Sequence, residues 1–199
     1  MIQGRSGLTL VDLVVSLTFV SILTLLLGGW ARSVITDVRR QQDTTELQEA
    51  VALTLDILIG EIRNAGFSAG TLATEAVVAA TEERLEIHSD FDGDGSFTGS
   101  HERLVFAYRA SNRQVTRASG QGSGQLLVSD VPPGGFRLTF YDRDRAQLVP
   151  GSNGLTTEQR AAVRRIDIHL AVERPGAGSE VRRQEATASL CLRNVQGGG

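Results

Sequence analysis

A long apolar segment near the N-terminus limits what this chain can form. The nineteen residues from 13 to 31 carry no charge, which is close to the roughly 20 residues that span a bilayer. A short polar leader ends at Gly7, and Asp12 stands five places later, inside the first turn of the expected helix. A carboxylate costs on the order of 3 kcal/mol near the middle of a bilayer and less near its edge. Because an ordinary membrane helix gains nothing from that charge, we expect Asp12 to pair with a cation once the segment leaves the lipid.

Residues 7 to 12, GLTLVD, resemble the class III signal of type IV pilins and type II secretion pseudopilins. The resemblance implies that a prepilin peptidase cuts after Gly7 and methylates the new amino terminus of Leu8. It also implies that Asp12 neutralises the terminal amine of a neighbouring subunit during filament assembly. Two residues depart from the family pattern: Leu8 replaces the usual phenylalanine, and Asp12 replaces the usual glutamate.

A plain signal anchor or a cleaved secretory signal is the alternative interpretation of the same segment. A secretory signal has a shorter apolar core, of roughly 7 to 15 residues, followed by a small-residue cleavage site. Trp30 and Arg32 are typical of an interfacial anchor at the outer end of a span. Since Arg5 stands alone in the leader, the loop charges do not decide orientation. The resemblance implies a single pass through the inner membrane with the rest of the chain in the periplasm.

Length and composition set further limits. At 199 residues the chain suits one domain plus its anchor. Removal of residues 1–7 takes away Arg5 and changes the formal net charge from −3 to −4, which argues against a nucleic-acid partner. All twenty basic residues are arginine, a bias that we attribute to a GC-rich genome. The single cysteine, Cys191, excludes an intrachain disulfide.

The helical pattern continues beyond the apolar segment. Apolar residues recur at mostly three- and four-residue spacing and form one stripe, in the order Val34, Val38, Ala50, Val51, Leu55, Leu58, Ile62 and Ala65. The pattern predicts a helix from about Leu8 to Ala65, roughly 85 Å long, that stops at Gly66. We expect residues 8–31 to lie in the membrane or filament core. Residues 32–66 form an amphipathic half that packs on a soluble domain.

The end of this predicted helix carries a second resemblance. Residues 61–67, EIRNAGF, are similar to a string found in PilW-type minor pilins and the J-type minor pseudopilins of type II secretion. The same residues also fit a helix C-terminus, with Arg63 near the last carbonyl groups and Gly66 as the cap. Both interpretations assign packing and capping to the string, and neither implies catalysis.

From residue 76 onward the hydrophobic pattern has a period of two, which predicts strands. The candidate strands are Arg84–Ser89, Arg103–Arg109, Gln114–Arg117, Gln125–Val131, Phe136–Asp142, Ile166–Glu173 and Arg183–Arg193. Glycine- and proline-rich turns separate them, so we expect one antiparallel, hairpin-rich sheet that buries the amphipathic half of the helix. The predicted fold class is α+β, with residues 67–199 as a β-rich head. His88 and His169 fall inside strands, where we expect half-exposed side chains rather than ligands.

An acidic loop follows the first candidate strand. Asp90, Asp92 and Asp94 alternate with other residues, and Gly95 follows the third carboxylate, as in loops that wrap a calcium ion. If Asp90 is the first position of an EF-hand loop, the backbone carbonyl of Ser96 is a further ligand. The closing position is then His101, which is not a carboxylate. Glu102, one place late, or a more distant carboxylate would have to close the shell. An Asp/Gly turn without metal is the alternative, although three clustered carboxylates repel one another unless a cation neutralises them.

These patterns favour a structural subunit over an enzyme. We expect a minor pilin or pseudopilin that helps initiate or cap a type IV pilus or a type II secretion pseudopilus, with other pilins as partners. The sequence leaves open which machine it serves. A signal-anchored, receptor-like binding module is the competing interpretation. An anchored enzyme is disfavoured because the chain has three histidines and no nucleophile elbow, phosphate loop or His-Glu-x-x-His spacing.

Overall fold

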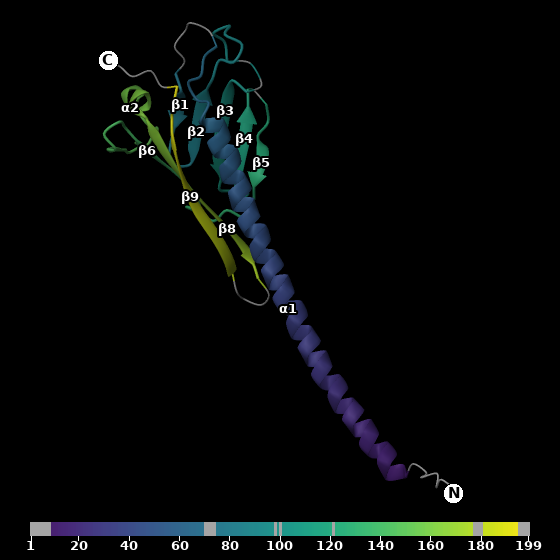
Figure 1. The fold of residues 1–199 in the computed structure, drawn as a ribbon. Helices are drawn as coiled ribbons and strands as arrows, with labels where there is room; N and C mark the ends of the chain where they lie inside the picture. Colours follow the sequence, from purple (N-terminus) through teal and green to yellow (C-terminus); the bar gives the residue numbers. More distant parts are fainter. Residues whose placement is uncertain are drawn as a thin grey trace. The chain divides into compact units, whose positions relative to one another are not determined.

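The computed structural model describes residues 9–69, 75–97, 99, 101–120, 122–176 and 181–194, without the side chain of Arg39. The chain divides into two units, residues 1–43 and residues 44–199. Its elements are α1 (Leu10–Ile62), β1 (Val77–Ala80), β2 (Arg84–His88), β3 (Arg103–Arg109), β4 (Gln114–Ser119), β5 (Gln125–Val128), β6 (Phe136–Tyr141), β7 (Gln147–Leu148), α2 (Thr157–Ala162), β8 (Arg165–Pro175) and β9 (Val181–Cys191) (Figure 1).

The first unit contains the N-terminal part of α1. This part is long and apolar enough to cross a membrane, with a mean hydropathy of 2.5 over 18 residues, none of them buried. The apolar side chains from Leu10 to Val38 are exposed. Val34 and Val38, which the sequence placed on the packing stripe, are therefore not part of the core.

The second half of α1 ends close to its predicted position. The helix stops at Ile62, three residues before the expected end, and tight turns continue to Gly66. Gly66 adopts a positive φ of 77° and donates its N–H to the carbonyl of His88, 2.9 Å away. The predicted helix end at Ala65 is therefore three residues too late, and Gly66 closes the turns that follow the helix. The predicted start at Leu8 lies outside the described residues.

The strands form two antiparallel sheets, so the expectation of one sheet is wrong. The first sheet has five strands in the order β1-β2-β3-β4-β5, and the second has four in the order β7-β6-β8-β9. All seven predicted strands are present, with ends that shift by up to three residues. The short elements β1, β7 and α2 were not predicted. The α+β class, a long N-terminal helix with antiparallel sheets, is confirmed.

Helix α2 did have a sequence signal. Thr156 caps it, accepting from the backbone N–H of Gln159 while the Gln159 side chain accepts from the backbone N–H of Thr156. This reciprocal pair is a capping box, whose Thr-x-x-Gln spacing is visible in the sequence. The helix has no buried residue, so the apolar period gave no indication of it.

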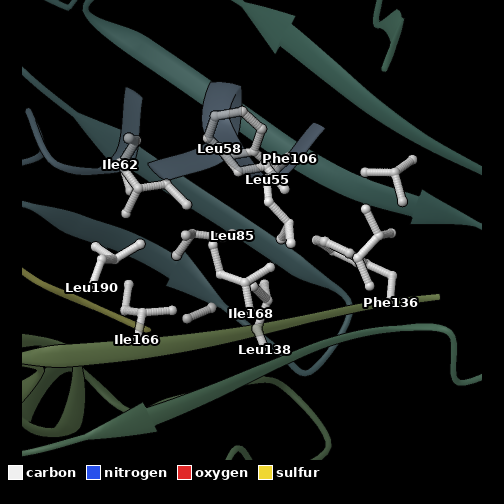
Figure 2. Close-up of a cluster of buried hydrophobic side chains, with 14 of the residues drawn as sticks. Leu55, Leu58, Ile62, Leu85, Phe106, Phe136, Leu138, Ile166, Ile168 and Leu190 are labelled. Atoms are coloured by element: carbon white, nitrogen blue, oxygen red, sulfur yellow. The ribbon is translucent and has the colours of Figure 1, made fainter. Parts of the chain in front are cut away.

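One hydrophobic core joins the helix and both sheets. The helix contributes a stripe of buried residues at three- and four-residue spacing, formed by Leu47, Val51, Leu55, Leu58 and Ile62. Phe106 and Leu85 face it from the first sheet, and Ile166 and Ile168 from the second (Figure 2). Because burial of one large apolar side chain stabilises a fold by about 1.5–3 kcal/mol, this cluster accounts for the packing of residues 44–62 on the strands.

Candidate functional site

The first candidate site is the beginning of α1, where Asp12 has a partner in its own chain. Its carboxylate Oδ2 accepts from the N–H of Thr9 at 3.1 Å and from the Thr9 hydroxyl at 2.7 Å. The Asp12 N–H in turn lies 3.3 Å from Thr9 Oγ1. This is the reciprocal geometry of a capping box, with aspartate in place of the usual glutamate. An acidic group also interacts favourably with the positive end of the helix dipole.

This contact corrects one premise of the sequence argument. A carboxylate in the first turn of this helix does have a local role, because the side chain of Asp12 caps the start of α1. The pairing of Asp12 with another subunit stays a prediction. The cleavage and methylation positions, Gly7 and Leu8, lie outside the described residues.

Hydroxyl groups inside the apolar segment are satisfied by the helix itself. The side chains of Ser16, Thr18, Ser21 and Thr24 each donate to the carbonyl oxygen four residues earlier, at 2.7–2.8 Å. Since lipid offers no hydrogen-bond partner, such internal bonds let these residues enter an apolar environment at low cost.

The second candidate site is the acidic loop between β2 and β3. Asp90 follows β2, Glu102 precedes β3, and Asp92 lies between them. Carboxylate oxygens of these three residues all lie within 4.8 Å of one another. Asp90 and Glu102 are buried, whereas Asp92 is exposed. The structure thus brings together three of the predicted ligands, including the closing carboxylate.

Backbone hydrogen bonds hold the two buried carboxylates in place. Glu102 accepts from the N–H of Gly99 at 2.8 Å and from that of Phe91 at 3.2 Å. Asp90 accepts from the N–H of Gly93 at 2.8 Å and from the hydroxyl of Ser68 at 3.1 Å. These donors offset part of the repulsion between the carboxylates, so the loop can form before any cation binds.

Asp94 and Ser96 are not in this cluster of three. The carboxylate of Asp94 accepts from the backbone N–H of Ser96 at 2.6 Å. Gly93 and Gly95 both have positive φ, 76° and 73°, which only glycine adopts readily. Calcium takes six to eight oxygen ligands, so the three clustered carboxylates fit part of such a shell, and carbonyl groups or water would have to supply the rest.

A partly buried ion pair near this loop was not predicted from the sequence. Arg117 Nε donates to both carboxylate oxygens of Glu61 at 2.7 Å, and Arg117 Nη2 lies 3.4 Å from His101 Nδ1. The Arg117 side chain is 11 % exposed. Glu61 opens the EIRNAGF string, so its carboxylate ties the end of α1 to β4. No local pattern reports a pair separated by 56 residues.

Both strand histidines are half-buried, as expected. The ring of His88 stacks on that of Phe97, with centroids 4.4 Å apart. His169 Nδ1 lies 3.3 Å from the hydroxyl of Thr187. His88 also stands 3.8 Å from Glu86, which accepts from Arg103 at 2.8 Å and from Arg84 at 3.1 Å.

Glu86 and His88 are expected to make the free energy of unfolding rise with pH over two separate pH ranges. Burial raises the pKa of Glu86, but hydrogen bonds from Arg103 and Arg84 outweigh it and leave the pKa below the ordinary 4.5. Burial lowers the pKa of His88 below 6.5. Each group binds fewer protons when folded, so the free energy of unfolding falls as pH drops below 6.5 and again below 4.5. Urea titrations from about pH 3 to about pH 8 measure this trend in both ranges. His88→Gln should flatten the upper range alone, and an unchanged slope there would contradict the assignment.

Comparisons with known proteins give a limited result. The chain matches no protein-family model, and it matches no curated protein. Among solved structures, a type IV-like pilin from Thermus thermophilus is similar at 13 % sequence identity with a TM-score of 0.47. The alignment covers 75 % of this chain and 98 % of that pilin.

Proposed function

We propose that this chain is a pilin-like structural subunit anchored in the inner membrane before it enters a filament. The observation that carries the proposal is Asp12 at the start of an uninterrupted apolar helix, five residues after Gly7 in the GLTLVD motif. A β-rich unit that packs on the second half of the same helix agrees with that role. The resemblance of residues 61–67 favours a minor pilin or pseudopilin that initiates or caps the fibre.

The mechanism is assembly rather than catalysis. A prepilin peptidase removes residues 1–7 and methylates Leu8, and the apolar helix then moves from lipid into the helical core of a filament. There Asp12 meets the amino terminus of a neighbouring subunit. An opposite charge at 4 Å is worth about 4 kcal/mol at an effective dielectric constant of 20, far more than in water.

Three substitutions at Asp12 separate pairing from capping. Asp12→Asn keeps an oxygen that can accept from Thr9 but removes the charge, Asp12→Ala removes both, and Asp12→Glu keeps the charge. If the charge drives assembly, the Asn and Ala variants should both enter filaments at least about tenfold less than the parent, and Glu should assemble. Immunodetection in sheared filament fractions from the native cell measures this. Normal incorporation of the Asn variant would show that capping alone matters.

Mass spectrometry of the mature N-terminus tests the competing interpretation. A methylated Leu8 supports the filament subunit. An intact Met1, or a cut near Ala31, supports a signal-anchored binding module instead.

We further propose that the acidic loop binds Ca²⁺ through Asp90, Asp92 and Glu102. With a Kd on the order of 0.1–1 mM, 10 mM Ca²⁺ should stabilise the chain by about 1.4–2.7 kcal/mol. Differential scanning calorimetry with and without EDTA measures the gain. Asp92→Asn should remove most of it, because this exposed ligand leaves the buried bonds of the loop intact. Asp144→Asn, in an exposed turn between β6 and β7, is the matched control. Equal shifts in both variants would exclude the site.

A further inference from the structure

Strand β9 is a long open edge of the four-stranded sheet, drawn in yellow in Figure 1. It runs for eleven residues without proline or glycine, and within the described part of the chain it pairs with β8 on one side only. The other outer strands of the described sheets are shorter. β7 has two residues and β5 has four, while β1 is partly covered because Leu155 donates its N–H to the carbonyl of Ala80 at 2.9 Å. An open edge of this length is a template for another strand.

The direction of the backbone groups on β9 follows from its register. The β8–β9 ladder is unbroken over eleven pairs, and Leu192 donates its N–H to Arg164 in line with that register. Because the bonding direction alternates along a strand, even-numbered residues bond to β8, and odd-numbered residues from 181 to 191 turn their N–H and C=O groups to the open side. A second strand must therefore form its hydrogen bonds with these odd-numbered residues, which we call the outward residues of β9.

Charge complementarity favours a second copy of this chain as the partner of the open edge of β9. Arg183 and Glu185 are both outward residues, two places apart, and in one copy Arg183 Nη2 lies 2.8 Å from Glu185 Oε2. When two copies of β9 pair antiparallel about Gln184, each Arg183 faces the partner's Glu185. Pairing about residue 183 or 185 instead sets like charges opposite each other, which is destabilising.

We propose that β9 is a homotypic interface, on which a second copy of this chain adds its own β9 in an antiparallel ladder over residues 181–187. Two four-stranded sheets then become one continuous sheet across a two-fold axis. Val181, 62 % exposed in the single chain, comes to lie opposite Thr187 of the second copy. A two-fold contact cannot repeat along a fibre whose subunits all point one way. The interface therefore belongs to the chain outside the filament and does not depend on the proposed assembly role.

Cysteine cross-linking of the full chain in detergent micelles tests the register. Cys191→Ser is included in every variant to remove the native thiol, which is exposed. Gln184→Cys places two thiols at the symmetry axis, where Cα atoms of a non-hydrogen-bonded pair are about 4.5 Å apart and a disulfide can form. Ser189→Cys, on the same strand but outside the paired stretch, is the matched control. Mild oxidation should give at least roughly fivefold more covalent dimer with Gln184→Cys than with Ser189→Cys. Equal yields at both positions would overturn the register.

A charge swap tests the pairing itself. Arg183→Glu turns two attractive contacts into repulsive ones and should weaken the dimer roughly fivefold or more by sedimentation equilibrium. The double variant Arg183→Glu with Glu185→Arg should recover most of the parent affinity, since the two faces are again complementary. Recovery stays below the parent value because the swap also removes the contact of Arg183 with Glu173 of its own chain, 3.3 Å away. A monomeric parent chain, or a double variant as weak as the single one, refutes the homotypic interface. Association that ignores both variants would assign dimerisation to the membrane helix.

Discussion

Replacing Phe106 with alanine is expected to lower the free energy of unfolding by about 3–5 kcal/mol. The Phe106 side chain is fully buried and is among the largest residues of the core cluster that includes Leu55 and Leu58 of α1 (Figure 2). The loss has two sources, the transfer free energy of the ring and the cavity that it leaves between helix and sheet. Because typical domains are stable by only 5–15 kcal/mol, this single change removes a large share of the total.

Urea unfolding followed by far-ultraviolet circular dichroism, with the full chain in detergent, measures the effect. Leu126→Ala is the control, since Leu126 is 55 % exposed on β5 and its loss should change stability by less than about 0.5 kcal/mol. A loss below about 1 kcal/mol for Phe106→Ala would mean that this part of the helix does not pack on the first sheet.

The sequence predicted the long helix and most strands of this fold better than it predicted which strands pair with one another. Residues 47–62 of α1 carry a strong helical period, and β6 and most of β8 carry alternating patterns, because each pattern depends only on which side of one element is buried. The division into two sheets depends on which distant strands pair. β6 pairs with β8 although β7 and α2 lie between them in the sequence. The alternating pattern within a strand does not encode which other strand it pairs with.

The candidate sites show the same limit. Asp90, Asp92 and Glu102 were predicted and do converge, but Asp94 accepts from its local backbone instead. Two positive-φ glycines flank Asp94 and turn the loop; the EF-hand pattern predicts the turn at Gly95 but not the one at Gly93. At the start of α1 the Thr-x-x-Asp spacing of a capping box is visible in the sequence, but Asp12 was interpreted only as a partner for a cation. The bond from Arg117 to Glu61 had no local signal.

Two glycines near the end of α1 are expected to respond in opposite directions to alanine. At Gly66 the φ of 77° disfavours any side chain, and a Cβ there would lie 2.9 Å from both the Ala76 Cβ and the Asn194 carbonyl oxygen. Left-handed strain of roughly 1–2 kcal/mol and overpacking of roughly 1–3 kcal/mol together predict a loss of about 3 kcal/mol for Gly66→Ala. At Gly60, inside the helix, a Cβ would meet nothing within 4 Å.

Gly60→Ala should therefore stabilise the chain by about 0.5–1 kcal/mol, because alanine loses less backbone entropy in a helix. The same urea titration measures both variants. Stability changes of opposite sign in the two variants would establish that the EIRNAGF string ends the helix through the backbone of Gly66. The Gly66 N–H also donates to the carbonyl of His88 on β2. If Gly66→Ala proved neutral, the left-handed cap would be absent and α1 would continue past Ile62. If Gly60→Ala proved destabilising, the surface around Gly60 would be in contact with something outside the described residues, since a methyl group there meets none of them within 4 Å.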